Sequence, residues 1–305
     1  MNHFIIVKKL SAIVLLASFA LSAQAQGVAD TTSYWKKKLT FSVNLNQAAF
    51  SSNWKAGGIN SIGLNSLFNY KANYLKDGHS WDNEIDLTFG FVNNSGQGYR
   101  KTVDRIFLDT KYGKALNKKW DLFTALNFLS QFTKGYKYND DNTSILISDA
   151  FAPAFITSAW GVEYHPVEYF KVRISPIAPR VTIVQNPTRF TKSVDPKPYG
   201  VDSTKTVRYE WLSFQLFAEF NKDIAPNINL KWRYIMYANY QTLSLQTIDH
   251  RIDLNLTAKV NKWVNVGVGG ILVYDYDQDS GVQLSQALTI GFLYTFQNYK
   301  DEEKK

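Results

Sequence analysis

Apolar and polar residues alternate one by one along almost the whole chain that follows residue 37. Leu39, Phe41, Val43 and Leu45 are separated by polar residues. The same period of two returns in segment after segment, and none of these segments shows a helical period. Because successive side chains of a β-strand point to opposite faces, the pattern predicts an all-β fold in which each strand has one apolar and one polar face.

The alternation delimits about 12 strands. Two of them, at residues 102–112 and 120–132, are blurred, and in the first Ile106 and Phe107 place apolar side chains on both faces. Counts of about 10 or 14 strands therefore stay open. The clearer strands span residues 38–45, 61–74, 81–91, 156–164, 170–175, 212–220, 228–236, 251–257, 263–274 and 287–296.

The connections between these strands alternate in length. Short connections are expected near residues 75–80, 113–119, 165–168, 221–227 and 260–262. Longer ones are expected near 46–60, 93–101, 133–153, 176–206, 240–247 and 275–283. Short periplasmic turns that alternate with longer extracellular loops are typical of a transmembrane antiparallel up-and-down β-barrel with both termini inside. A secreted water-soluble β-protein, the rival architecture, does not explain this alternation.

Composition agrees with a barrel that crosses a membrane by strands. Aromatic residues make up 15% of the chain, and several stand where strands would meet the periplasmic side, among them Tyr74, Trp81, Trp120 and Tyr164. Aromatic rings favour the membrane–water interface. After residue 25, no apolar run approaches the roughly 20 residues that a membrane helix needs.

The two ends of the chain predict export and a polar tail. Lys8 and Lys9 precede an apolar run, and Ala23-Gln24-Ala25 is a small-residue cleavage site, as in a secretory signal peptide. We therefore expect a cleaved signal peptide at 1–25, an outer-membrane barrel at 26–297 and a polar periplasmic tail at 298–305. The chain has no cysteine, so disulfides and thiolate metal sites are excluded.

Four short motifs carry a resemblance to a known family. They are Asn53-Trp54-x-x-Gly57-Gly58-x-Asn60-Ser61, Trp81-Asp82-Asn83-Glu84, Lys101-x-x-Asp104-Arg105 and Ser175-Pro176-Ile177-Ala178, in this order. Together they resemble an uncharacterised family of outer-membrane β-barrel proteins of Bacteroidota-type bacteria. The likeness covers essentially the whole mature chain. It implies an outer-membrane location and a barrel fold, and it implies no activity.

Charged residues in the strands predict a charged lumen. Lys or Arg facing lipid near the bilayer midplane costs roughly 2–4 kcal/mol, so these side chains should point inward. An acidic wall on the third strand would then face a basic wall on the seventh and ninth strands, with an acid of the eighth strand beside it. The residues expected to line the lumen are Asp82, Glu84, Asp86, Lys171, Arg173, Glu219, Lys231, Arg233, Arg251 and Asp253.

Two functions fit such a lumen. Opposed charges can line a narrow passive channel for polar or ionic solutes. Alternatively, they bridge and close the lumen of a structural or accessory subunit of an envelope complex. The partners expected are outer-membrane lipid and, in the second case, an envelope protein. Nucleic acid is not expected, because the 34 basic and 26 acidic residues are scattered and form no basic face.

The first outer loop holds a further motif, Asn53, Trp54, Gly57 and Gly58. Glycines allow backbone conformations that are closed to other residues. The loop could therefore fold into the barrel mouth with Trp54 as its anchor. The plainer interpretation is a tight loop whose tryptophan packs on neighbouring loops.

Neither an enzyme nor a metal or cofactor site is expected. His79 and His165 lie in short turns. His250, with Asp249 and Ser244 nearby, could suggest a hydrolase, but nothing in the sequence makes them converge. Calcium could use Asp140, Asp141 and Asn142, or Asp275, Asp277 and Asp279, yet neither set has the remaining ligands at a recognised spacing.

Overall fold

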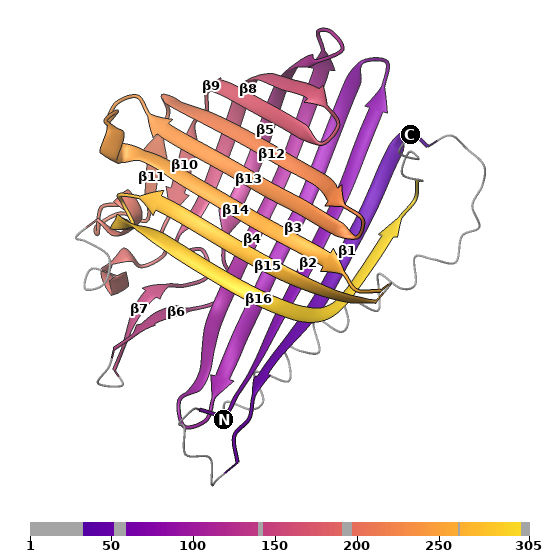
Figure 1. Ribbon diagram of the computed structural model, residues 1–305. Helices are drawn as coiled ribbons and strands as arrows, with labels where there is room; N and C mark the ends of the chain where they lie inside the picture. Colours follow the sequence, from indigo (N-terminus) through magenta and orange to yellow (C-terminus); the bar gives the residue numbers. More distant parts are fainter. Residues whose placement is uncertain (1–32, 52–58, 140–142, 191–196, 262, 300–305) are drawn as a thin grey trace. The chain divides into compact units, whose positions relative to one another are not determined.

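The strands close into one antiparallel barrel of 12 strands, as the alternation predicted. The computed structural model describes residues 33–51, 59–139, 143–190, 197–261 and 263–299. Each barrel strand pairs with its neighbours along the chain, and β1 pairs with β16 to close the ring (Figure 1). The barrel strands are β1 (Trp35–Ala48), β2 (Ser61–Lys76), β3 (His79–Asn94), β4 (Gly98–Ala115), β5 (Trp120–Ser130), β8 (Ala154–Val167), β9 (Phe170–Ile177), β12 (Ser213–Ala225), β13 (Ile228–Asn239), β14 (Ile248–Lys259), β15 (Val264–Asp275) and β16 (Asp279–Gln297).

Short elements occupy the longer connections. β10 (Arg180–Ile183) pairs with β8, and β11 (Val207–Glu210) pairs with β10, so they prolong this part of the wall. β6 (Gly135–Tyr138) and β7 (Ser144–Ser148) form a hairpin between β5 and β8. Three short 3-10 helices, η1 (Pro187–Phe190), η2 (Pro198–Gly200) and η3 (Leu245–Thr247), lie in loops. Among the described residues, no helix is long and apolar enough to cross a membrane.

The connections follow the predicted alternation with two exceptions. β2 and β3 are joined by the turn Asp77–Gly78, and β8 and β9 by residues 168–169. On the opposite side, however, the connections expected near 93–101 and 275–283 are tight turns, at residues 95–97 and 276–278. Gly96 and Gly98 there have φ values of 79° and 72°, which other residues rarely adopt. The strands therefore continue further than their alternation indicates.

The distribution of polarity is reversed relative to a water-soluble protein. On β3, Glu84 and Asp86 are buried inside the barrel, whereas Trp81 and Ile85 on the outer face are 48% and 37% exposed. Water-soluble proteins rarely bury charged groups while they expose large apolar ones in this systematic way. An apolar outer face around a polar interior is the arrangement of a transmembrane barrel.

Aromatic pairs ring the end of the barrel that carries the short turns. Ring centroids lie 5.3 Å apart for Trp35 and Tyr74, and 4.7 Å apart for Trp120 and Tyr164. Further round the barrel, the Trp263 ring stacks on a Phe of β16 at 5.6 Å. These rings form the girdle that marks one membrane–water interface.

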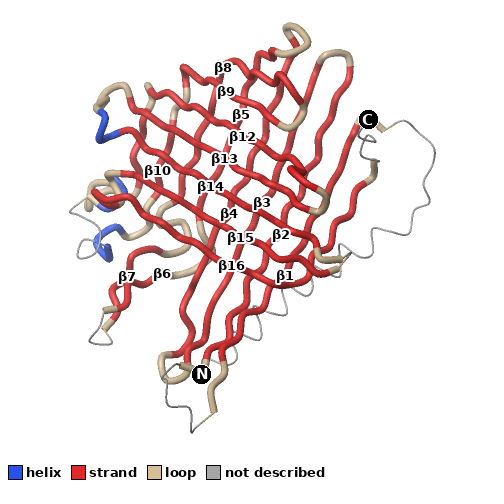
Figure 2. Tube along the Cα trace, in the orientation of Figure 1, coloured by secondary structure: helices blue, strands red, loops and turns tan. Residues whose placement is uncertain are grey.

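At the other end, the two longest loops pack on each other (Figure 2). Their small apolar core contains Ala152, Val184, Phe190, Tyr199 and Val201. The Tyr199 hydroxyl donates to a backbone carbonyl of β7, and burial raises the pKa of Tyr199. The described parts of these two loops thus form a small packed core beyond the barrel strands.

Several predicted features lie outside the described residues. These are the signal peptide at 1–25, the loop motif Asn53, Trp54, Gly57 and Gly58, the acidic run 140–142, and residues 300–305 of the tail. Within the tail, the Asn298 side chain donates to the Trp35 carbonyl at 3.0 Å.

Candidate functional site

The ten charged residues predicted to line the lumen lie on inward-facing positions of five strands, β3, β9, β12, β13 and β14. Asp82, Glu84 and Asp86 come from β3 and Glu219 from β12. Cross-strand register brings Glu219 opposite Lys171 on one side and opposite Arg233 on the other. Because side chains alternate between the two faces of a strand, inward positions two residues apart stack along the lumen and can meet those of the facing wall.

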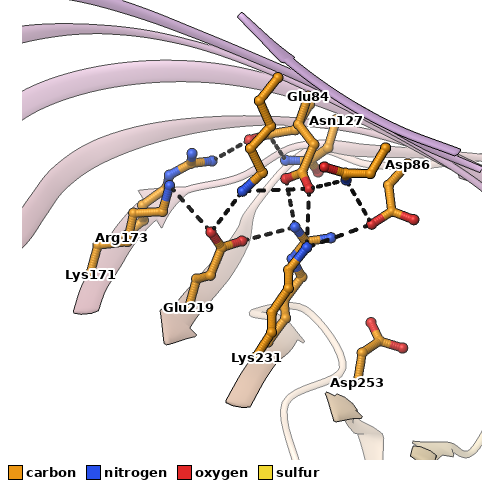
Figure 3. Close-up of polar contacts among 12 residues, drawn as sticks. Glu84, Asp86, Asn127, Lys171, Arg173, Glu219, Lys231 and Asp253 are labelled. Carbon is orange, nitrogen blue, oxygen red and sulfur yellow. Dashed lines mark hydrogen bonds and ion pairs between the residues drawn. The ribbon is translucent and has the colours of Figure 1, made fainter. Parts of the chain in front are cut away.

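At the centre of the lumen, Arg233 joins the walls. Its guanidinium lies 2.6 Å from a Glu84 oxygen and 2.8 Å from a Glu219 oxygen. The amino group of Lys231 lies 3.4 Å from Glu84 and 3.8 Å from Asp86 (Figure 3). The predicted acidic wall of β3 and basic wall of β13 are therefore in direct contact.

Lys71, a residue that the sequence analysis did not select, completes this centre. Its amino group lies 3.2 Å from Glu219 and 3.7 Å from Glu84. Lys171 approaches Glu219 more loosely, at 3.8 Å, and its side chain is 28% exposed. Each central carboxylate therefore faces at least two cations, which offsets the cost of removing it from water.

A second group of ion pairs lies beside the first. Arg173 contacts Asp109 at 2.8 Å and Glu163 at 3.0 Å. Lys111 lies 2.5 Å from Glu163 and 3.0 Å from Asp82. The Arg173 and Lys111 side chains are only 4% and 2% exposed. This group occupies the lumen against β4, β8 and β9.

A third group links β3 and β4 with β14. Arg105 lies 2.7 Å from Asp86 and 3.2 Å from Asp253. Arg251 pairs with Asp253 on its own strand at 2.9 Å. The first and third groups share Asp86, and the second lies beside them. We define the lumen cluster as Lys71, Asp82, Glu84, Asp86, Arg105, Asp109, Lys111, Glu163, Lys171, Arg173, Glu219, Lys231, Arg233, Arg251 and Asp253.

Aromatic rings support the cations of the lumen cluster. The Arg233 guanidinium lies 4.4 Å from the Phe107 ring centre, and Arg173 lies 4.7 Å from that of Phe217. Phe107, Phe123 and Phe217 are 3–4% exposed. Stacking of a guanidinium on a ring favours Arg over Lys at such positions.

These inward rings explain why the fourth and fifth strands looked blurred in the sequence. On β4, the inward positions are Arg105, Phe107, Asp109 and Lys111; on β5, Phe123 lies inward. An apolar ring among the charges breaks the apolar-out alternation. The cluster members on β4 could therefore not be assigned from the sequence, although Asp109 and Lys111 keep the period of two.

On the opposite wall of the lumen, five neighbouring inward positions carry small side chains. The inward positions of β15 and β16 include Gly267, Gly269, Ser285, Ala287 and Thr289. All five are half-buried or exposed, unlike the buried centre of the lumen cluster. We call this surface the small-residue wall, and it leaves a water-accessible space beside the cluster.

Above the cluster lies a small cavity of about 80 Å³. Its lining includes Arg180, Tyr237 and Asp249. The Arg180 guanidinium lies 2.8 Å from Asp249 and 3.2 Å from the Tyr237 ring centre. A second polar layer therefore stands between the cluster and the loops.

The residues weighed for hydrolysis do not converge. Asp249 points inward to Arg180, whereas the His250 ring lies 2.8 Å from the Tyr234 hydroxyl on the outer face. Neighbours on a strand face opposite ways, so this histidine and this aspartate cannot form a relay.

Two of the acids considered as calcium ligands, Asp275 and Asp277, make contacts in and around the β15–β16 turn instead. Asp275 accepts from the backbone of Asp277 and from Gln278. Asp277 also pairs with Arg208.

One group of potential metal ligands lies near the turn end of the lumen. Asp121, Glu163 and His165 each place a ligand atom within 4.8 Å of the others. Both Glu163 oxygens already face Lys111 and Arg173. These two cations would oppose a metal ion there.

Comparison with known proteins identifies one family over part of the chain. Residues 45–136 match the family described as "Protein of unknown function (DUF3078)". The match agrees with the expected resemblance to an uncharacterised family. No curated protein matches the chain.

Solved structures give weak likenesses. The chain is similar to an outer-membrane channel (COG4313) from Pseudomonas putida F1, with 12% identity, a TM-score of 0.39 and coverage of 88% of this chain and 100% of the other. It is also similar to the translocator domain of the autotransporter NalP from Neisseria meningitidis, with 9% identity, a TM-score of 0.37 and coverage of 95% and 98%. The assignment of the fold rests on the strand pairing described above.

Proposed function

We propose that this protein is an outer-membrane barrel that acts as a narrow passive channel for small polar or ionic solutes. The observation that carries the proposal is the asymmetry of the lumen. The lumen cluster fills one side, while the small-residue wall leaves accessible space on the other. A solute would pass along β15 and β16, next to charges that are fixed by their partners.

The cluster accounts for selectivity in this proposal. Its acids and bases are nearly equal in number and contact each other directly. A paired cluster creates a weak net field, so the channel should discriminate by size more than by sign of charge. Large solutes are excluded because Arg233 and Glu84 meet across the lumen at 2.6 Å.

The test is conductance of the purified protein in planar bilayers. Wild type should show small, stable conductance steps. Ala287→Trp places a large ring on the small-residue wall and should reduce the conductance several-fold. Leu288→Trp is the matched control, because Leu288 is the next residue on β16 and faces outward, 65% exposed. This control should conduct like wild type.

The same cluster favours a second candidate, a closed barrel that serves as an accessory subunit of an envelope complex. Direct pairing across the lumen supports it. In that case the wild-type protein carries no current in planar bilayers, and the Ala287→Trp variant carries none either. Equal conductance of wild type and Ala287→Trp would contradict the channel along the small-residue wall.

A further inference from the structure

The seam that closes the barrel is paired over only part of its length. β1 and β16 pair from Lys38 with Gln297 to Asn44 with Gly291. Beyond this point β1 continues to Ala48 and β16 extends back to Asp279. Figure 1 shows β16, in yellow, bending away from β1. Among the described residues, the wall is therefore closed near the short turns and unpaired in its outer half.

The unpaired part of β16 is exposed on both faces. Every position from Asp279 to Leu288 is exposed, and in the described part of the chain this stretch pairs only with β15. Its inward positions belong to the small-residue wall. The opening in the seam is thus continuous with the accessible side of the lumen.

Gly291 lies at the end of the paired seam, where the two backbones come close together. A Cβ at Gly291 would lie 2.3 Å from the Val43 carbonyl oxygen and 2.6 Å from the Asn44 Cα. No other residue permits so close an approach of two backbones. The last pair of the seam is therefore a close approach of the two backbones, and beyond it β16 no longer pairs with β1.

The opening spans most of the depth of the membrane's hydrocarbon band. The aromatic girdle includes Phe292, which stacks on Trp263. From Phe292 to Leu284, a strand tilted by about 45° rises about 19 Å. The apolar band of an outer-membrane barrel is roughly 25 Å tall. Leu284 and Ile290 therefore flank the opening within the hydrocarbon region.

Polarity changes across the opening. The outward side chains at its edge are apolar and largely exposed: Leu284 is 69%, Leu288 65% and Ile290 57% exposed. The inward positions carry Gln283, Ser285 and Thr289. Lipid cannot satisfy unpaired backbone groups, so water from the lumen must reach this edge. A molecule at the opening therefore meets hydrocarbon on one side and a polar, hydrated surface on the other.

We propose that the outer half of the β1–β16 seam is a lateral portal for a single-chain amphiphile with a polar head. The acyl-like chain would pass between Leu45 and the apolar edge of β16, while the head stays beside the small-residue wall. A partner β-strand fits less well. The two edges diverge, and β1 offers only residues 45–48 beyond the paired segment, so an added strand could not pair with both.

Single labelled cysteines test this portal in bilayers, because the chain has no cysteine of its own. A bimane fluorophore is attached to Ser285→Cys, inward at the opening, or to Thr40→Cys, inward beside the paired seam opposite Thr295. Doxyl-labelled stearate is the quencher. We expect quenching at position 285 to exceed that at position 40 several-fold. Equal quenching, or none at either position, overturns the portal.

A tether across the opening gives the second measurement. Continuing the register of the seam would place Asn46 opposite Thr289. Asn46→Cys/Thr289→Cys bridged by a short bismaleimide should lower binding of dansyl-undecanoate at least fivefold. The control Thr40→Cys/Thr295→Cys tethers a segment that is already paired and should change nothing. Equal effects of both tethers, or a polypeptide that copurifies and shields position 285, overturn the proposal.

Bilayer conductance reports passage along the barrel axis, whereas quenching and amphiphile binding report the lateral opening. Failure of the proposed channel and failure of the proposed portal are therefore distinguishable.

Discussion

The two sides of the lumen wall use the same strand geometry and opposite side chains. On β3, β4, β12 and β13, the inward positions carry long charged groups that meet across the lumen, such as Glu84 and Arg233. On β15 and β16 several inward positions carry only small side chains, such as Gly267, Gly269 and Ala287. The width of the free lumen is therefore set by inward side-chain volume and not by the number of strands alone.

The two sides of the lumen should also respond differently to substitution. In the lumen cluster, each buried charge depends on its partners, because an unpaired buried charge is costly. On the small-residue wall, water reaches the surface and substitutions meet few neighbours. We expect stability to respond to changes in the cluster and transport to respond to changes on the small-residue wall.

The largest effect is expected from Arg233→Met. This change leaves Glu84 and Glu219 without their closest cation and should lower the free energy of unfolding by about 3–5 kcal/mol. Urea titration in lipid vesicles, followed by heat-modifiable gel mobility, measures it. Lys171→Met is the control, because the ion pair of Lys171 with Glu219 is 3.8 Å long and should contribute less than about 1 kcal/mol.

A double variant that removes an opposing charge together with Arg233 tests whether the two side chains interact. In Arg233→Met/Glu84→Gln, one stranded carboxylate is gone, and the loss should be smaller than the sum of the two single losses. Strict additivity would show that these side chains do not meet across the lumen.

A medium effect is expected from Gly161→Ala on β8. The added Cβ would lie 1.9 Å from the Ile174 carbonyl oxygen, so the backbone must shift at a cost of about 1–3 kcal/mol. Gly269→Ala, on the small-residue wall, would meet nothing closer than Asn255 at 3.4 Å. It should stay within about 0.5 kcal/mol of wild type. The same urea titration compares them, and equal losses would contradict the difference between the two sides.

The smallest effect is expected from Asp82→Asn. Asp82 is the more accessible partner of Lys111, with a side chain that is 26% exposed. Its neutralisation leaves Lys111 less compensated and should shift ion selectivity toward anions by about twofold, equivalent to roughly 0.4 kcal/mol. Reversal potentials under a salt gradient measure the shift. Asp202→Asn, in an exposed loop, is the control. A shift of the same size in that variant would show that the change in selectivity does not arise from the charge of Asp82 in the lumen.

Much of the fold follows from local pattern. The period of two located ten of the barrel strands clearly and left β4 and β5 blurred, and lipid on the outside fixes which face is apolar. The acids of β3 could be assigned to the lumen for the same reason. The pattern failed at Phe107 and Phe123, because an aromatic ring inside a charged lumen is stabilised by cations from other strands, which no local window contains.

The sequence by itself determined the strands, their inward and outward faces, and the presence of opposed charges on β3 and β13. Only the tertiary structure decided which charges pair, that Lys71, Arg105, Lys111 and Glu163 join them, and that β16 leaves β1 beyond Gly291. Alternation is a property of neighbours along one strand. Pairing across the lumen and closure of the seam depend on register and distance between strands far apart in the chain, which alternation does not encode.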